Sequence, residues 1–267
     1  MKLKTLAISA LFALATAAAQ AAPLKIGVVP GAYSDAAIVA AEEAKARGLD
    51  VEVVEFSDWT TPNVALAAGD IDLNFFQHVP FMENAEKQGG YHFAAVAPGI
   101  LANLGLYSLR HKSFDEIPDG GSVAIANDPV NQGRGLLLLQ KAGLIKLRDG
   151  VGFLGTVDDI AENPRHLKFT EVEGPQLVRI TGDVDLAQGY PHFIVAAGTF
   201  DPAGALIYSG IEDRKFAVNF VSRQDNKDDP RIRAFIDVFQ HSQKVRDQIH
   251  KSFANSDKLY ILAWEGK

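Results

Sequence analysis

One polar segment, NDPVNQGR at residues 127–134, has the residue types needed to hold an anion. It follows a buried-strand pattern, SVAIA, and Asp128 and Pro129 are typical of a helix N-cap and first turn. Asn131 and Arg134 are three residues apart, which places them side by side on that helix. A guanidinium there can bind a carboxylate through two parallel hydrogen bonds, aided by free amides at the helix start. The alternative is an exposed arginine in a surface salt bridge.

A second segment, DIDLNFFQHVPF, ends a predicted strand with two aromatic residues and a histidine. Alternation with a period of two puts Ile71, Leu73 and Phe75 on one face of the strand, in the core. Phe76 and His78 stand at the carboxyl end of the strand, where open α/β sheets bind ligands. His78 has three interpretations: a hydrogen-bonded structural residue, a metal ligand, or one wall of a pocket.

The pocket interpretation adds Trp59, which comes before the helix pattern that leads into this strand. Trp59, Phe76 and His78 together offer flat apolar faces and one polar tip, which suits an uncharged side chain. Metal binding is disfavoured because the seven histidines show no helical i, i+4 pair and no acidic partner at zinc-site spacing. We therefore favour a small-molecule pocket and predict no metal and no other cofactor.

A short motif occurs twice, as GDIDL at residues 69–73 and as GDVDL at residues 182–186, each time before aromatic residues and a proline. A comparable set of strand ends in each half predicts two similar lobes that face each other across a cleft. The loop after the second motif, QGYPHF, then adds Tyr190 and His192 to the pocket from the second lobe. The alternative is that both are ordinary structural residues.

Strand and helix patterns alternate along the chain, which is typical of parallel sheets covered by helices. We predict an α/β fold with a first lobe formed by residues 22–108 and 215–267, and a second lobe formed by residues 109–214. The segment 103–109 is predicted to close the first lobe and cross over, and the segment 215–223 to cross back. Two crossover strands form a hinge.

The first predicted unit shows the local signals. LKIGVV at residues 24–29 has the pattern of a buried strand, and Ser34 is the expected N-cap of a helix that ends near Arg47. A strand follows at residues 50–56. Near the other end of the chain, a helix is predicted over residues 229–240 and is expected to pack back on the first lobe.

The first 21 residues have the pattern of a secretory signal peptide. Two lysines precede an apolar run and then small residues, with cleavage predicted between Ala21 and Ala22. The apolar run is about half the length that a membrane-spanning helix needs. An uncleaved anchor is the alternative.

Composition limits the classes of function. The sequence has no cysteine, which excludes disulfides, a thiolate zinc site and a cysteine nucleophile, and leaves no cysteine for lipid attachment. Export without disulfides indicates a bacterial periplasmic protein. The net charge is −7 and the basic residues are dispersed, so nucleic acid is not predicted as a partner. Common catalytic motifs are absent, and we predict no catalytic residue. An exported enzyme without a local motif is the rival hypothesis.

Several long blocks resemble, in order, the methionine-binding lipoproteins that deliver substrate to bacterial ABC importers. They are EFSDWTTPNVALAAGDIDLNFFQHVPF, VAIANDPVNQGRGLLLLQKAGLIKLRDGVG, ENPRHLKFTEVEGPQL and DNKDDPRIRAF. The resemblance implies a two-lobed periplasmic binding protein fold, type II-like, that closes on a small amino acid or related carboxylate. Methionine is the leading ligand, and the membrane permease of an importer is the implied partner.

The resemblance also implies roles for the residues already singled out. Trp59 stands where the family usually has an aromatic residue, commonly tyrosine. Phe76 and His78 match residues that enclose the methionine side chain. Asn131 and Arg134 match residues that hold the polar end of the amino acid. This agrees with the carboxylate site inferred from spacing.

The chain departs from the family pattern at three places. Where family members carry a lipid-attachment cysteine, this chain has AQAAP. Where the family has a ligand-bonding asparagine in the second lobe, this chain has Tyr190 or His192, depending on where a small gap is placed. A further family asparagine on the recrossing strand corresponds to Asn219, or to Val218 if the alignment slips by one residue.

Overall fold

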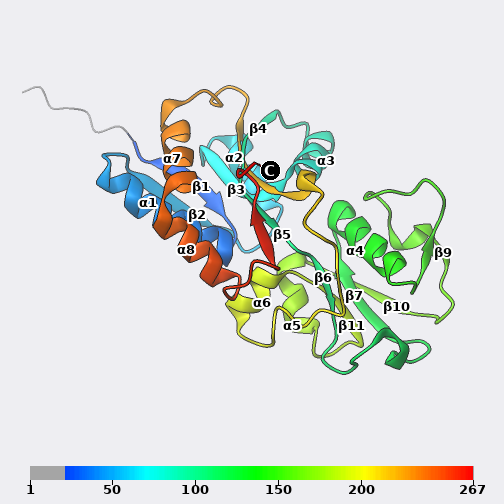
Figure 1. Cartoon of the computed structure of the whole chain (residues 1–267). Coiled ribbons are helices and arrows are strands. Elements are labelled where there is room, and N and C mark those ends of the chain that lie inside the picture. The colour runs from blue at the N-terminus through cyan, green and yellow to red at the C-terminus, as the bar shows by residue number, and fades with distance from the viewer. Residues whose placement is uncertain (1–21, 267) are drawn as a thin grey trace, which may run out of the picture.

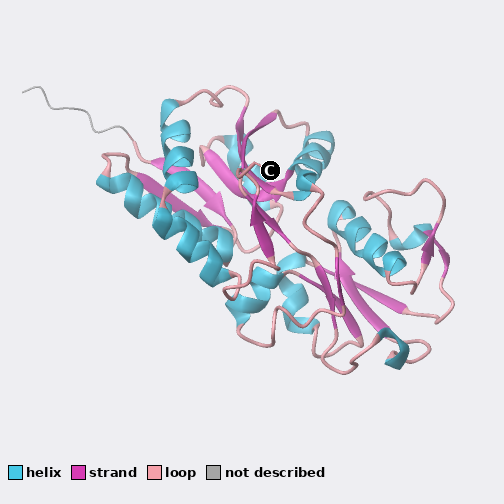
Figure 2. Cartoon of the chain, in the orientation of Figure 1, coloured by secondary structure: helices cyan, strands magenta, loops and turns pink. Residues whose placement is uncertain are grey.

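The computed structural model describes residues 22–266, so the predicted signal peptide lies outside the described residues. These residues form two α/β lobes, each built on a five-stranded sheet (Figure 1). Helices pack around both sheets, as the colouring by secondary structure makes clear (Figure 2). Within residues 22–266, no helix is both long enough and apolar enough to cross a membrane.

The first sheet has the strand order β2-β1-β3-β13-β4. In that order its strands are Val51–Glu55, Leu24–Val28, Leu73–His78, Val218–Arg223 and Phe93–Pro98. Its helices are α1 (Ala32–Ala46), α2 (Thr61–Ala68), α3 (Val79–Gly89), α7 (Pro230–His241) and α8 (Gln243–Ser252). Helices α7 and α8 pack against α1, so the end of the described chain returns to the first lobe as predicted.

The second sheet has the order β10-β7-β11-β6-β12. Its strands are Lys168–Val172, Ser122–Ala126, Leu186–Gly189, Gly105–Tyr107 and Ile207–Tyr208. Its helices are α4 (Pro129–Lys141), α5 (Leu177–Ile180) and α6 (Pro191–Ala197). Two small ladders complete the pairing: β5 (Ile100–Ala102) with β14 (Tyr260–Leu262), and β8 (Lys146–Leu147) with β9 (Ile160–Glu162).

The two sheets have the same plan. In each, the first three strands in order are parallel, and the fourth strand is antiparallel to its neighbours. In both sheets, the second aspartate of the repeated GDIDL or GDVDL motif bonds the start of a neighbouring strand. Asp72 Oδ2 accepts a hydrogen bond from the backbone N–H of Lys25 at the start of β1 (3.0 Å). Asp185 Oδ2 accepts one from the backbone N–H of Ser122 at the start of β7 (2.8 Å).

The crossover from the first lobe differs from the prediction. Strand β6 (Gly105–Tyr107) pairs with β11 and β12, so it belongs to the second sheet and does not close the first. The change of lobe therefore falls before residue 105, whereas the sequence pattern predicts it after residue 108. Leu106 and Tyr107 are both buried, and an apolar strand of this kind does not reveal which sheet it joins. The return crossover leads into β13, as predicted.

Two local predictions near the N-terminus of the described chain are wrong. Helix α1 has Gly31 as its N-cap, and Ser34 lies inside the helix, where its hydroxyl donates to the carboxylate of Glu55. Ile71 lies before β3 and packs with Leu66 and Val221, in a different cluster from Phe75. Phe75 itself is fully buried, as predicted, with its ring stacked on Phe220 at 4.2 Å.

Candidate functional site

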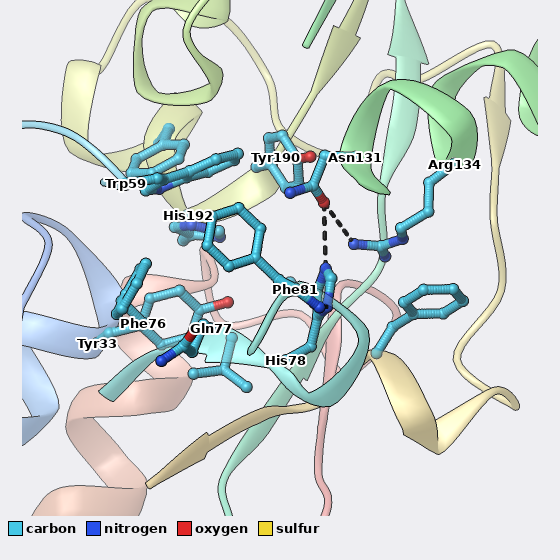
Figure 3. Close-up of a pocket in the computed structure, with 14 residues that line it drawn as sticks. Tyr33, Trp59, Phe76, Gln77, His78, Phe81, Asn131, Arg134, Tyr190 and His192 are labelled. Carbon is cyan, nitrogen blue, oxygen red and sulfur yellow. Dashed lines mark hydrogen bonds between the residues drawn. The ribbon is translucent and has the colours of Figure 1, made fainter. Parts of the chain in front are cut away.

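A cavity lies between the two lobes, with about 470 Å³ of space counting its open mouth. Its walls come from the end of β3, from the loops that follow β2 and β11, and from the N-terminal halves of helices α1, α3, α4 and α6 (Figure 3). The end of β5 and the segment that returns into β13 complete them. The lining residues are Tyr33, Trp59, Phe76, Gln77, His78, Phe81, Ala102, Asn131, Arg134, Tyr190, His192, Phe193, Phe216 and Val218. Seven of the eight predicted site residues are among them.

His78 is fixed by hydrogen bonds at both ring nitrogens. It is the N-cap of α3, and its Nδ1 accepts a hydrogen bond from the backbone N–H of Phe81 (3.1 Å). Its Nε2 therefore carries the proton and donates to Oδ1 of Asn131 in the other lobe (3.2 Å). Burial, with a smaller effect from the Arg134 charge, lowers the pKa of His78 to about 3. The imidazole is neutral at pH 7 and has no nitrogen free for a metal ion, which contradicts the metal interpretation.

Asn131 connects this histidine to the arginine. Asp128 caps α4, as predicted, by accepting a hydrogen bond from the backbone N–H of Asn131 (2.9 Å). The Asn131 side-chain amide also donates to both carboxylate oxygens of Asp128 (3.1 and 3.2 Å). Its Oδ1 accepts from His78 and from Nη1 of Arg134 (3.1 Å), as Figure 3 shows. Both lone pairs of that oxygen are thus used.

Arg134 brings a positive charge to the cavity wall. Its guanidinium lies over the ring of Phe216, 4.3 Å from the centroid, and it makes no ion pair with any residue of the described chain. Burial lowers the pKa of Arg134 from its ordinary value, and the group still stays protonated. The surface salt bridge considered from the sequence is therefore contradicted.

Aromatic rings form the other end of the cavity, opposite the guanidinium (Figure 3). The Trp59 ring meets the ring of Tyr190 edge-on at 5.6 Å and lies 6.3 Å from that of Phe193, both in the second lobe. Gly174, at the start of a short 3₁₀ turn in the second lobe, lies directly against the indole, so that a Cβ there would be 2.0 Å from Trp59 Cη2. Phe76 extends the apolar surface. This end can hold a compact apolar side chain.

The second strand end supplies Tyr190 and His192, and both face the cavity as predicted. The Tyr190 hydroxyl accepts a hydrogen bond from Nε2 of Gln188 (3.0 Å). His192 is 2% exposed, and its Nδ1 has no hydrogen-bond partner among the described residues. Burial lowers the pKa of His192 to about 3, so this imidazole is also neutral at pH 7.

Asn219 is the one predicted site residue that does not line the cavity. Its side-chain amide donates to the backbone carbonyl of Ala217 (2.8 Å). Val218, the alternative raised by a one-residue slip, lines the cavity in its place, opposite His78 in the sheet. The β13 ladder has a register shift between Asn219 and Phe220, and a bulge of this kind changes which side chains share a face.

Several cavity residues are not among the site residues predicted from the sequence. Tyr33 follows the carboxyl end of β1, so the strand-end rule applied to His78 also points to it. Phe81 and Phe193 each follow the proline in the first turn of a helix, α3 and α6 respectively. Phe216 comes from a 3₁₀ turn, Arg214–Phe216, for which the sequence gives no signal. Gln77 is buried, and its side chain bonds Asn63 beneath the pocket wall.

The fold and the interlobe cavity define the class of two-lobed periplasmic-type binding proteins. Comparison with known proteins agrees, because the model of the NlpA lipoprotein family matches residues 24–261. The chain belongs to the NlpA lipoprotein family.

Individual relatives show how far the similarity extends. The D-methionine-binding lipoprotein MetQ of Escherichia coli O157:H7 is 44% identical over 232 residues, covering 86% of this chain and 85% of that protein. A nutrient binding protein of Burkholderia cenocepacia, solved bound to methionine, is 37% identical with a TM-score of 0.81, covering 86% of this chain and 97% of that one. An ABC transporter periplasmic substrate-binding protein of Coxiella burnetii is 34% identical with a TM-score of 0.81, covering 90% and 99%.

Proposed function

We propose that the protein is a periplasmic solute-binding protein of an ABC importer that closes its lobes on a small amino acid or related carboxylate, with methionine as the leading ligand. The observation that carries the proposal is Arg134, a cavity-lining cation without an ion pair in the described chain. A partly buried guanidinium favours an anionic partner, and a carboxylate matches its paired donors. The D-methionine-binding relative and the relative solved bound to methionine support the same class of ligand.

The opposite end of the cavity supports an apolar ligand side chain. Trp59, Phe76, Phe81 and Phe193 enclose it, and a thioether packs well against aromatic rings. We infer binding without turnover, because the one lining histidine in contact with the polar end has both nitrogens engaged and is a very weak base. The implied partner is the membrane permease of the importer.

Calorimetric titration of the purified protein with L- and D-methionine tests this function. Saturable binding is expected, and Arg134→Ala should weaken it by about a hundred-fold or more, because two charge-assisted hydrogen bonds are each worth roughly 1.5–3 kcal/mol. Arg148→Ala is the control, since Arg148 is an exposed arginine that pairs with Asp159. Equal effects of the two substitutions would refute the carboxylate site. No saturable binding of any amino acid or small carboxylate would refute the function.

A further inference from the structure

The cavity has a net charge of +1. Among the residues that line it in the described chain, Arg134 is the one charged side chain, and none is an aspartate or a glutamate. His78 and His192 are neutral at pH 7 because burial lowers the pKa of each to about 3. A ligand with net charge −1 therefore neutralises the cavity, whereas a zwitterion leaves one positive charge uncompensated.

Two carboxylates near Arg134 do not change this balance at the ligand. Asp128 lies outside the lining, and both its oxygens bond the side chain of Asn131. Asp213 also lies outside the lining, and its carboxylate pairs with Nζ of Lys215 at 2.7 Å. Neither is placed to meet the ammonium group of a bound amino acid.

Two neutral acceptors at the polar end already accept hydrogen bonds within the protein. Asn131 Oδ1 accepts two hydrogen bonds, from His78 and from Arg134. The oxygen of Tyr190 accepts one from Gln188. Val218, which lines the cavity and lies opposite His78 in the sheet, is aliphatic and offers no side-chain acceptor. An ammonium group brought here would meet no counter-charge among the described residues of the lining, so the loss of its water would be poorly compensated.

Groups suited to an uncharged polar substituent are present. The imidazole of His192 has an unpartnered nitrogen, and the Tyr33 hydroxyl is directed into the cavity (Figure 3). Tyrosine and neutral histidine both donate and accept hydrogen bonds. They can therefore bond a hydroxyl or keto oxygen without a counter-charge.

We propose that, among small carboxylates with an apolar side chain, this cavity prefers those that lack an α-ammonium group, such as α-hydroxy and α-keto acids. The proposal rests on the proposed binding function and narrows its ligand class. It departs from two of the relatives, one named a D-methionine-binding lipoprotein and one solved bound to methionine. The carboxylate still binds Arg134, and the side chain still occupies the aromatic end.

The test is a calorimetric comparison of three ligands that differ only at the α-carbon: methionine, its α-hydroxy analogue and its α-keto analogue. Both enantiomers are used where they exist, with the purified protein at pH 7. We expect the better of the two analogues to bind about ten-fold or more tightly than methionine. Methionine binding as tightly as the analogues, or more tightly, overturns the preference and leaves the proposed function intact. If none of the three binds, the preference is refuted, whereas the proposed function fails only if no amino acid or small carboxylate binds.

A pair of variants at Val218 tests the physical reason. Val218→Asn places an amide acceptor opposite His78, and Val218→Leu places a side chain of the same γ-branched shape there without an acceptor. The ratio of the Kd for methionine to the Kd for the hydroxy acid should fall at least about five-fold in Val218→Asn relative to Val218→Leu. Equal ratios in the two variants would show that a missing acceptor does not set the preference. Circular dichroism confirms that both variants fold.

Discussion

The two strand-to-helix corners, β3 to α3 and β11 to α6, have the same backbone arrangement but different side chains at the helix start. In both, an aspartate of the repeated motif holds the start of the neighbouring strand, and the chain then turns into a helix that has proline in its first turn. At the N-cap the corners diverge. His78 caps its helix with its side chain, whereas Tyr190 makes no side-chain cap.

The two histidines that follow these strands differ in whether the protein itself satisfies their ring nitrogens. His78 has both ring nitrogens bonded, one to its own helix and one to the opposite lobe. His192 is equally buried, and its Nδ1 has no partner in the described structure. Buried polar groups without partners are uncommon, since each costs free energy unless something else satisfies it. The histidine of the first corner thus has both ring nitrogens hydrogen-bonded within the protein, whereas the histidine of the second corner has one nitrogen without a partner in the described chain.

Substitution of the two motif aspartates, Asp72 and Asp185, should lower the free energy of unfolding by different amounts. Asp185→Ala removes hydrogen bonds from the backbone and hydroxyl of Ser122 and from His111, and should lower the free energy of unfolding by about 3 kcal/mol. Asp72→Ala loses its bond from Lys25 and should cost about half as much. Urea denaturation measures both, with the exposed Asp183→Ala as control. A larger loss in Asp72→Ala would contradict the comparison.

His78→Phe should be the next most destabilising change, at about 2 kcal/mol. It leaves the N–H of Phe81 without its cap and removes the hydrogen bond between the lobes. The same denaturation experiment measures it, and His92→Phe, at an exposed position, is the matched control. A loss no greater than that of the control would mean that the first corner does not depend on its cap.

The two histidines should contribute equally to the pH dependence of stability. The native pKa of each is about 3, below the ordinary value of ~6.5, so the unfolded chain binds protons that the native protein does not. Stability is therefore full above pH ~6.5 and falls by up to about 1.4 kcal/mol per pH unit for each histidine as the pH drops toward 3. Removing either one should roughly halve the slope between about pH 6 and 5. An unchanged slope in His192→Phe would contradict its neutral burial.

His192→Phe should have the smallest effect on stability at pH 7, and in the opposite direction from His78→Phe. The substitution keeps the ring and removes an unsatisfied buried nitrogen, so the free energy of unfolding should stay the same or rise by up to about 1 kcal/mol. Thermal and urea denaturation both measure it. A clear loss of stability would show that the imidazole has a partner essential to the fold.

Many strands, helix starts and strand ends could be predicted from the sequence, because they depend on local signals. Period-two alternation placed Phe75 in the core, and the cap pattern placed Asp128 at the start of α4. The repeated motif correctly indicated two equivalent strand ends. Spacing on one helix then brought Asn131 and Arg134 together at the cavity.

The remaining features depend on which distant segments meet. The membership of Gly105–Tyr107 in the second sheet is decided by pairing with β11 and β12, and its residues are apolar enough for either sheet. The bulge in the β13 ladder, which brings Val218 and not Asn219 to the cavity, leaves no mark on the local pattern. The bond between His78 and Asn131 joins positions 53 residues apart and exists only because the lobes meet.

The contact of Trp59 with the second lobe makes intrinsic tryptophan fluorescence a reporter of lobe closure. The chain has two tryptophans, and the other, Trp264, packs against Phe239 of α7 in the first lobe, outside the cavity lining. Separation of the lobes would take the Trp59 indole away from Gly174 and Tyr190 and expose it to water, while Trp264 keeps its surroundings. Emission from a Trp264→Phe variant would then follow opening and closing in real time, without any attached dye.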